Sequence, residues 1–335
     1  MGLQIGEIVP RREINLSELK NKIIAVDAFN AIYQFLSSIR QQDGTPLMDN
    51  QKRVTSHLSG IFYRNVSLLS EGIKLVYVFD GEYHALKGRT QENRASAKHD
   101  AQEKYEKAVE GGDIEGMRRY STGFMKLDDE MIAESKELLE ALGIAVVQAP
   151  GEGEMQCSKL VNDKEAYAVA SQDYDAIVVG GARLIQNLTL ARKRKTRNGT
   201  VDISPEIIEY EKVLNTLEID SDQLICLAIL VGTDFNPGGV RGIGPKKALA
   251  LVKAKKYPVE IFREVEHQIN FDWHEVFEIF KKPNVASVKV KFPKLDFERV
   301  KKILVEKHDF SLERVEKQFE KLRETKRQSA QRTLF

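Results

Sequence analysis

Short apolar segments followed by carboxylates recur along this chain, and strand and helix signals alternate between residues 20 and 235. This alternation predicts an α/β fold with a parallel-type central sheet flanked by helices. The carboxyl ends of parallel strands lie along one edge of a sheet, and ligands bind there in open sheets. The acids just past the apolar segments are expected to gather at that edge; they are Asp27, Asp80, Glu152, Glu154, Asp173, Asp175 and Asp234.

A single aspartate after a strand is usually a helix cap or a turn residue, because its side chain accepts backbone hydrogen bonds. Independent caps do not explain why the acids are doubled at Glu152-x-Glu154 and at Asp173-x-Asp175. Carboxylates gathered in one place repel one another strongly unless cations lie among them. The pattern therefore indicates a divalent-metal site. Since no histidines are paired at ligand spacing, Mg²⁺ or Mn²⁺ is favoured over zinc.

Asp234 differs from the other acids because it follows a predicted helix. Residues 222–232 are expected to be helical, with Ser221 as the N-cap and Asp222 in the first turn. The C-terminus of a helix is electronegative, so an acid just beyond it is unfavourable without a positive charge nearby. The position of Asp234 therefore supports the metal-site interpretation.

The composition allows a full core and excludes several protein classes. The chain has 335 residues, of which 42% are apolar and 30% are charged, yet the formal net charge is only +1. It has two cysteines without a CxxC motif, which indicates no disulfide framework. With no signal segment and no apolar run of about 20 residues, we expect a soluble intracellular protein that does not enter a membrane.

A charged insertion at residues 82–130 interrupts the alternating pattern, and it is far longer than an ordinary connection. Residues 87–109 are predicted to be a helix, and one of its faces is basic at Lys87, Gln91, Arg94 and Lys98. A charge run is usually a solvated face, but this helix begins soon after Asp80. Cations there would neutralise a phosphodiester as charge develops on it.

A glycine turn at residues 241–247, Arg-Gly-Ile-Gly-Pro-Lys-Lys, is predicted to begin a helix at Pro245. Exposed backbone N–H groups at the start of that helix would form an anion site, reinforced by Lys246 and Lys247. Such contacts hold a DNA backbone without reading its sequence. Two glycines alone are often only a turn, but this motif with two lysines is typical of a helix–hairpin–helix-type module.

With these motifs in place, the chain resembles the flap endonuclease family of structure-specific 5′ nucleases, and it is most similar to the archaeal branch. The resemblance runs nearly end to end. Its most specific blocks are Val26-Asp27-Ala28, Ile32-Tyr33-Gln34-Phe35-Leu36, Thr55-Ser56-His57-Leu58, and the segments 76–81, 149–154, 171–175, 232–236 and 242–245.

The resemblance implies a PIN-like nuclease core that spans residues 1–322 as a single domain. Residues 82–130 would form a helical arch and cap through which a 5′ flap threads. Residues 221–260 would form a helix–two-turn–helix module that binds duplex DNA and K⁺, and residues 323–335 would form a C-terminal tail.

The resemblance also implies two Mg²⁺ ions, with Mn²⁺ as a substitute. The residues matching Asp27, Asp80, Glu152 and Glu154 would hold one ion, and those matching Asp173, Asp175 and Asp234 would serve the other. Lys87 and Arg94 match catalytic residues that contact the scissile phosphate, and Tyr33 matches a tyrosine that stacks on the neighbouring nucleotide. Positions expected to contact DNA are Gly2, Arg40, Arg64, Gln91, Lys98, Gly242, Gly244, Lys246 and Lys247.

The implied function is a 5′ flap endonuclease and 5′–3′ exonuclease in Okazaki-fragment maturation and DNA repair. We expect a monomer that acts on branched DNA in the cytoplasm, or in the nucleus if the source is eukaryotic. The family tail binds a sliding clamp, and Gln331 and Leu334 match the first half of its box. The aromatic pair that ends the box is absent, so the tail is either an incomplete box or a plain disordered terminus.

Three other functions are weighed against this one. A DNA-junction binder without catalysis would have no need of the seven acids. A 5′ exonuclease or a bubble-cutting relative shares the core, but the compact 82–130 insertion favours threading of a free end. A Mg²⁺-dependent phosphatase of another α/β fold would explain the acids but not the basic helix face or the glycine turn.

Overall fold

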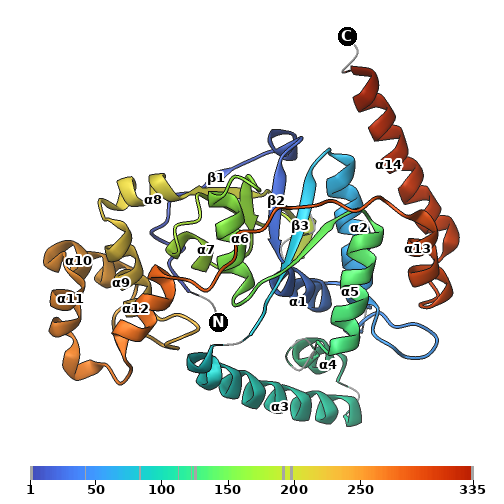
Figure 1. Cartoon of the computed structure of the whole chain (residues 1–335). Helices are drawn as coiled ribbons and strands as arrows, with labels where there is room; N and C mark the ends of the chain where they lie inside the picture. Colours follow the sequence, from blue (N-terminus) through green and yellow to red (C-terminus); the bar gives the residue numbers. More distant parts are fainter. Residues whose placement is uncertain are drawn as a thin grey trace.

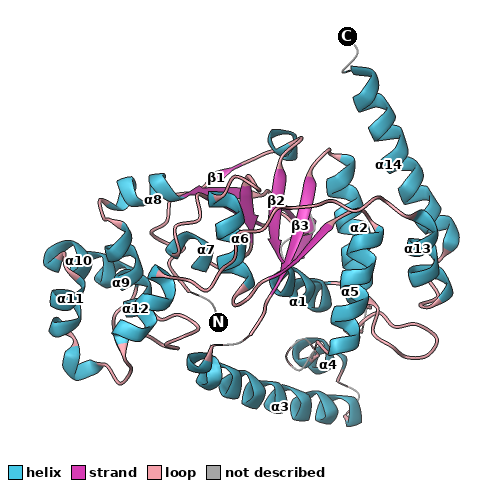
Figure 2. Ribbon diagram, viewed as in Figure 1, coloured by secondary structure: helices cyan, strands magenta, loops and turns pink. Residues whose placement is uncertain are grey.

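The computed structural model describes residues 3–41, 43–82, 84–111, 113–121, 123, 127–190, 193–196 and 199–332. Its centre is a sheet of seven strands, which lie in the order β1-β9-β6-β5-β2-β3-β4 (Figures 1 and 2). The strands are β1 (Arg12–Glu13), β2 (Ile23–Asp27), β3 (Lys74–Phe79), β4 (Ala145–Gln148), β5 (Ala168–Ala170), β6 (Arg183–Gln186) and β9 (Glu206–Glu209).

The predicted α/β class with a parallel-type central sheet is confirmed. Strands β6, β5, β2, β3 and β4 are parallel, so their carboxyl ends lie along the same edge. The prediction missed an antiparallel edge, because β9 pairs with β6 and β1 pairs with β9 in the antiparallel sense. Alternation of apolar and polar residues identifies strands, but it does not give the direction of their partners.

A second, two-stranded sheet is formed by β7 (Lys193–Thr196) and β8 (Gly199–Asp202). In its antiparallel register, Lys193 is opposite Asp202 and Thr196 is opposite Gly199. Residues 193–195, which are all basic, therefore belong to a hairpin between β6 and β9.

Helices cover both faces of the central sheet and bury two separate cores. One face, with Ile24, Val26 and Tyr77, packs against α1 (Ala28–Ser38), α2 (Ser56–Ser70), α5 (Asp129–Ala141), α13 (Phe297–Lys301) and α14 (Leu312–Arg332). The other face packs against α6 (Gly153–Asn162), α7 (Asp175–Val178), α8 (Tyr210–Leu217) and α9 (Ser221–Val231). Because side chains alternate along a strand, adjacent residues such as Ile24 and Ala25 enter different cores.

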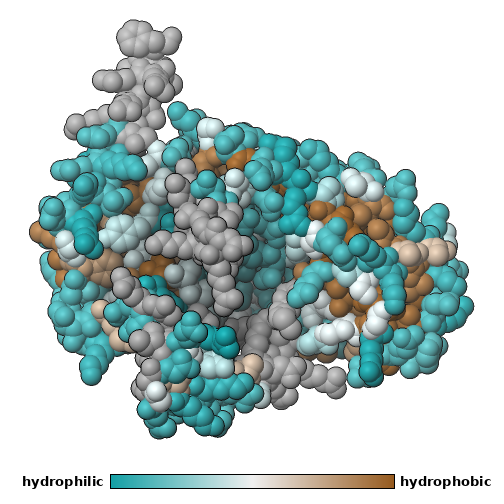
Figure 3. All heavy atoms as spheres, turned by 180° about the vertical axis from the view of Figure 1, so that it is seen from behind, coloured by the Kyte–Doolittle hydropathy of each residue, from teal (hydrophilic) through white to brown (hydrophobic). Residues whose placement is uncertain are grey.

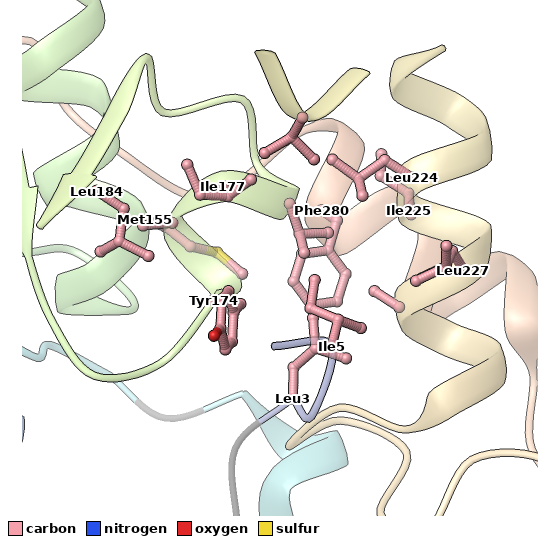
Figure 4. Packing of buried hydrophobic residues seen from close by; sticks show 14 of the residues in the cluster. Leu3, Ile5, Met155, Tyr174, Ile177, Leu184, Leu224, Ile225, Leu227 and Phe280 are labelled. Carbon is pink, nitrogen blue, oxygen red and sulfur yellow. The ribbon is translucent and has the colours of Figure 1, made fainter. Parts of the chain in front are cut away.

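The second core extends into a helical group at one side of the molecule, and the N-terminal segment is part of the same core. This group contains α10 (Pro245–Lys255), α11 (Pro258–Glu264) and α12 (Trp273–Lys281). Leu3 and Ile5 are buried between α9 and the α6–α7 region (Figure 4). The segment therefore ties the glycine turn before α10 to the edge of the sheet.

The charged insertion is helical, as predicted. It contains a short 3₁₀ turn (Ala85–Lys87), α3 (Gly88–Glu110) and α4 (Ile114–Tyr120). Figure 1 shows α3 crossing below the sheet, on the side of α1. Lys87 ends the 3₁₀ turn, and Gly88 after it has helical dihedral angles, so the basic face continues from Lys87 into α3.

The predicted N-cap of α9 was wrong by one residue. Asp220 is the cap: its carboxylate accepts the N–H of Gln223 at 2.9 Å, and the Gln223 side chain accepts the N–H of Asp220 at 2.8 Å. This reciprocal pair needs an acceptor and a glutamine three residues apart. Ser221 lacks such a partner because Leu224 is at that spacing.

Helix α14 carries the backbone through residue 332. Among its described side chains, Val315, Phe319 and Leu322 are buried. Seen from behind, the molecular surface is mainly hydrophilic with scattered apolar patches (Figure 3). Within the described ranges, no helix has the length and apolar character needed to cross a membrane.

Candidate active site

The acids predicted from the sequence meet at the carboxyl edge of the parallel strands. Asp27 is the last residue of β2, Asp80 follows β3, and Asp173 follows β5. The other four acids lie at the start of α6, in the first turn of α7 and just beyond α9; they are Glu152, Glu154, Asp175 and Asp234. All seven belong to one electrostatic group, because each either raises the pKa of another member or has its own pKa raised by one.

Asp27 and Asp80 are held by backbone N–H groups at the starts of two helices. Asp27 caps α1, where its Oδ1 accepts the N–H of Asn30 at 3.1 Å. Asp80 accepts the N–H of Gly153 at 2.7 Å, at the start of α6. The capping interpretation is therefore correct for Asp27, and it coexists with the clustering. A helix N-terminus carries partial positive charge, which helps to keep a carboxylate in this position.

Glycine is required at position 153 because the backbone passes close to Asp80. A Cβ atom there would lie 2.6 Å from Asp80 Oδ1 and 3.1 Å from the carbonyl oxygen of Val78. Both distances are shorter than ordinary contacts. The Gly153 of the Glu-Gly-Glu motif thus allows Asp80 to approach α6.

Repulsion and burial strongly perturb the acids. Burial, together with the charges of Asp80 and Asp173, raises the pKa of Asp27 to about 8, while the N–H of Asn30 opposes the shift. Burial, Asp173 and Asp234 raise the pKa of Asp175 to about 7. The pKa of Glu154 is also raised by burial and by neighbouring carboxylates, although its Oε1 accepts the N–H of Ala176 at 3.2 Å.

Lys87 lies among these acids. Its ammonium forms an ion pair with Glu152 and sits 5.0 Å from the centre of the Phe235 ring. Burial alone would lower the pKa of Lys87, but Glu152, Asp234 and Asp175 raise it above its usual value. The start of the insertion is therefore drawn to the acidic edge by charge, as the sequence predicted.

The far end of the basic face also lies over the site. Lys98 Nζ is 5.6 Å from the ring centre of Tyr33, which is on α1 and is 39% exposed. The side chains of Gln91 and Arg94, between Lys87 and Lys98 on α3, are outside the described residues. Gly2 is outside them as well. The contacts of Lys87 and Lys98 nevertheless place both ends of the face beside the acids and Tyr33.

The donor set fits a hard divalent cation. It contains only carboxylate oxygens, which Mg²⁺ and Mn²⁺ prefer. Asp175 Oδ1 is buried and has no hydrogen-bond partner, so it is an acceptor that a cation would satisfy. In the described part of the chain, no three Asp, Glu, His or Cys side chains are arranged to hold a metal ion. Because carboxylates repel one another, we expect these acids to come within ligand distance of a common point only when a cation is bound there.

The glycine turn has the predicted local structure. Gly242 has a φ of 81°, Gly244 is the N-cap of α10, and Pro245 is the first helical residue. A Cβ atom at Gly242 or Gly244 would meet no atom within 4 Å, so the backbone is open to a ligand. Lys246 is paired with Glu7 at 3.3 Å, and Lys247 donates to the carbonyl of Gly242 at 3.1 Å. A cavity of about 590 Å³, lined by Gln4, Asp173 and Pro245 among others, lies between this turn and the acids.

The two arginines expected at the DNA are half-buried, Arg40 just after α1 and Arg64 on α2. Arg40 donates to the carbonyls of Ser37 at 3.2 Å and Gly44 at 2.8 Å, and burial lowers its pKa. Arg64, on α2, also has its pKa lowered by burial. Of the two expected clamp-binding residues, Leu334 is outside the described residues, and Gln331 is described only as part of the α14 backbone.

The sequence interpretation missed Asn30 and Ser171. The amide of Asn30 donates to Asp173 Oδ2 at 3.1 Å and accepts the N–H of Gln172 at 3.3 Å. The hydroxyl of Ser171 lies 3.5 Å from Asp27 Oδ2 and accepts the N–H of Asp173 at 3.2 Å. The available signal was the position of Asn30, three residues after Asp27 in the first turn of a helix.

Comparisons with known proteins agree with this geometry. Residues 3–101 match the XPG N-terminal domain, and residues 143–234 match the XPG I-region. Flap endonuclease 1 of Thermococcus onnurineus is 46% identical over 337 residues, which cover 100% of this chain and 98% of that protein. Flap endonuclease 1 of Pyrococcus furiosus is 47% identical over 337 residues, with 100% and 98% covered.

A solved structure extends the likeness to three dimensions. The flap endonuclease-1 from Methanococcus jannaschii superposes with a TM-score of 0.75 at 38% identity, covering 97% of this chain and 98% of that one. Similarity of this extent includes both the acidic edge and the insertion above it. The chain belongs to the flap endonuclease family.

Proposed function

We propose that this chain is a structure-specific 5′ flap endonuclease with 5′–3′ exonuclease activity. It hydrolyses the phosphodiester bond where a 5′ single strand leaves duplex DNA, in Okazaki-fragment maturation and DNA repair. The observation that carries the proposal is the group of seven carboxylates around Lys87, at the start of the helical insertion of a chain of this family. A junction binder without catalysis would not need this group, whose charges repel and therefore reduce stability.

Nucleases of this family depend on metal ions, and we assign the acids to two Mg²⁺ sites, with Mn²⁺ as a substitute. Asp27, Asp80, Glu152 and Glu154 would hold one ion; Asp173, Asp175 and Asp234 would serve the other. Two such ions supply activation of the attacking water and charge stabilisation at the leaving 3′ oxygen. Support comes from the all-oxygen donor set and from the unpartnered Oδ1 of Asp175.

The chain's own residues orient the acids and the substrate. The backbone N–H groups of Asn30 and Gly153 hold Asp27 and Asp80 in place. Lys87 and Arg94 would neutralise the non-bridging oxygens of the scissile phosphate, and Tyr33 would stack on the adjacent base. In this scheme Lys87 exchanges its contact with Glu152 for the phosphate once cations compensate the acids.

We infer that duplex DNA docks on the glycine turn. The open backbone at Gly242 and Gly244 supports binding of a phosphate together with K⁺. Gly2, Arg40, Arg64, Gln91 and Lys98 would add contacts nearer the junction. Replacing Lys246 and Lys247 by alanine should weaken binding to all sequences alike and flatten its salt dependence by about one unit of slope per lost phosphate contact. A loss confined to particular sequences would contradict this docking mode.

The remaining parts are assigned on the same basis. Residues 1–322 form the nuclease domain, with the arch and cap at 82–130 and the helix–two-turn–helix region at 221–260. The tail at 323–335 would bind a sliding clamp through Gln331 and Leu334. We propose that the protein is a monomer and that it acts in the cytoplasm, or in the nucleus if the source is eukaryotic.

The decisive experiment uses a 5′-labelled double-flap DNA with Mg²⁺, with EDTA, and with Mg²⁺ after a bulky group has blocked the 5′ end. A single product at the junction, lost in EDTA and on blocking, supports a threading flap endonuclease. Binding without cleavage in Mg²⁺ would overturn the proposal in favour of a junction binder. The variant Asp173→Ala should bind but not cut, while Glu211→Ala, at an exposed position on α8, should cut normally.

A further inference from the structure

A second cluster of charged groups lies away from the acidic edge, where residues 307–309 meet the loop at residues 39–55. The loop is drawn in blue beside α5 in Figure 1. Two hydrogen bonds connect it to this segment. The guanidinium of Arg53 donates to the carbonyl of Lys307, and the N–H of Asn50 donates to Asp309 Oδ2 at 3.0 Å. The turn of the loop is itself closed by Asp49, which accepts the N–H and the Nε–H of Arg53 at 2.9 and 2.7 Å.

His308 is at the centre of this cluster, and its side chain joins the loop to α5. The residue is only 2% exposed. Its Nδ1 is 3.0 Å from Asp49 Oδ2, and its Nε2 is 3.0 Å from Glu134 Oε1. Lys307 Nζ is 2.5 Å from the same oxygen of Glu134. One imidazole ring thus contacts two carboxylates that are 85 residues apart in sequence. One belongs to the loop before α2, and the other belongs to α5.

The geometry determines the charge of this ring. An ionised carboxylate only accepts hydrogen bonds, and a neutral imidazole has one N–H donor, so contacts on both ring nitrogens require the imidazolium form. Both carboxyls are kept ionised. Burial raises the pKa of Asp49, but hydrogen bonds from Arg53 and His308 bring it down to about 2. At Glu134 burial is likewise outweighed by Lys307 and His308, which lower its pKa.

His57 provides a contrast within the same region. It is fully buried on α2, and neither ring nitrogen has a hydrogen-bond partner. Burial lowers the pKa of His57 to about 4, and the charge of His308 contributes to this shift. Of these two buried histidines, His57 is therefore neutral, whereas His308 has partners that stabilise a charge.

We propose that His308 is a positioning residue whose imidazolium fixes the 39–55 loop against α5 and thereby places Arg40 for DNA binding. The loop begins at the end of α1, and its Arg40 faces Tyr105 of α3, so its position also bears on the insertion. A neutral ring in this place would direct a lone pair at a carboxylate 3.0 Å away, and the repulsion would release the loop. The part concerning DNA rests on the proposed function; the charge of the ring does not.

Other charged and titratable groups face His308 from each element packed around it. From the loop these are Asp49 and Arg53, from α2 His57, from α5 Glu134, and from its own segment Lys307 and Asp309; Asp128, at the start of α5, acts on His57. Lys307 and Arg53 already neutralise part of the negative charge, so the imidazolium is needed mainly for geometry. Buried ionic groups contribute more to the specificity of an arrangement than to its stability.

The charge is tested directly by ¹⁵N–¹H NMR of histidine-labelled protein at pH 7.5, with His308 assigned from the spectrum of His308→Gln. We expect both ring nitrogens of His308 to be protonated and His57 to be a neutral tautomer. A neutral His308 at this pH would overturn the proposal. The result does not depend on DNA or metal, so it is separate from success or failure of the proposed function.

The consequence is tested by measuring the affinity for double-flap DNA in Ca²⁺ at pH 7.5. His308→Gln, which retains one amide donor, should bind about tenfold more weakly than the wild type, because apparent affinity scales with the fraction of molecules in the competent state. His274→Gln, at an exposed position on α12, should bind as the wild type does. Equal affinities of the wild type and His308→Gln would overturn the positioning role.

Discussion

The amide nitrogen of Asn30 donates a hydrogen bond of 3.1 Å to Asp173 Oδ2, while the backbone N–H of the same residue donates to Asp27 at 3.1 Å. Asn30 therefore connects an acid assigned to one metal ion with an acid assigned to the other. Its amide orientation is fixed, because its oxygen accepts the N–H of Gln172. Residues that hydrogen-bond to metal-binding side chains, as Asn30 does here, orient those side chains before the metal ion binds.

Replacing Asn30 by alanine should weaken metal binding, because Asp173 loses a donor that holds its orientation. The expected loss in Mn²⁺ affinity is about tenfold or more, measured by a calorimetric or spin-resonance titration without DNA. Asn215→Ala, on the exposed side of α8, is the matched control. Unchanged affinity in Asn30→Ala would show that Asp173 is held adequately by the Ser171 loop alone.

Replacing Asp175 by asparagine should stabilise the protein in EDTA and abolish cleavage in Mg²⁺. Burial and the charges of Asp173 and Asp234 disfavour its ionised form, so removing the charge relieves repulsion. We expect a rise of about 2 °C or more in the melting temperature in EDTA, measured by calorimetry. The wild type should gain more from Mg²⁺ than the variant does. A fall in stability in EDTA would mean that the carboxylate has a structural partner.

Much of the fold and of the acidic edge follows from short-range patterns. Runs such as residues 75–79 identify strands, and the common direction of those strands brings the acids together. Lys87 contacts Glu152 and Lys98 lies near Tyr33, while the common face predicted for them stays a prediction. These local sequence patterns do not identify which residues far apart in the sequence contact one another in the fold. The Asn30–Asp173 contact spans 143 positions and the His308–Asp49 contact spans 259, and nothing in local sequence encodes either.

Pairing direction and cap choice were missed for similar reasons. β9 returns to β6 in the antiparallel sense after the β7–β8 hairpin, and strand propensity is the same for both directions. The cap of α9 was placed at Ser221 although Asp220 has the glutamine partner three residues later. Both serine and aspartate are good caps, so the choice between them depends on the reciprocal hydrogen bond.

Replacing Gly153 by alanine should displace Asp80 and reduce both stability and cleavage. The added methyl group would lie 2.6 Å from Asp80 Oδ1 and 3.1 Å from the Val78 carbonyl. We expect a loss of about 1–3 kcal/mol in the free energy of unfolding, measured by denaturant titration. Gly88→Ala is the matched control, since a Cβ atom at the start of α3 would meet no atom within 4 Å. Equal stability of the two variants would contradict the close packing of β3 against α6.

Replacing Lys87 by methionine should slow the chemical step more than it weakens DNA binding. The side chain stays long and unbranched, but the charge that faces Glu152, and by proposal the phosphate, is removed. A reduction of about 10²-fold or more is expected in the single-turnover rate at saturating enzyme. Lys107→Met, at an exposed position on α3, should behave as the wild type. If only the dissociation constant changes, Lys87 is a docking residue.

Replacing Asp49 by asparagine should lower stability at neutral pH, and the difference from the wild type should disappear in acid. Its pKa is depressed to about 2 in the folded protein, compared with about 3.9 in an unfolded chain. A carboxyl with a depressed pKa stabilises the fold above the unfolded pKa and loses this contribution as the pH falls through the folded one. Denaturant titrations should therefore show a gap of roughly 1–3 kcal/mol at pH 7, which narrows between pH 4 and pH 2. A gap that stays constant over this range would mean that Asp49 acts through its shape and not through its charge on Arg53 and His308.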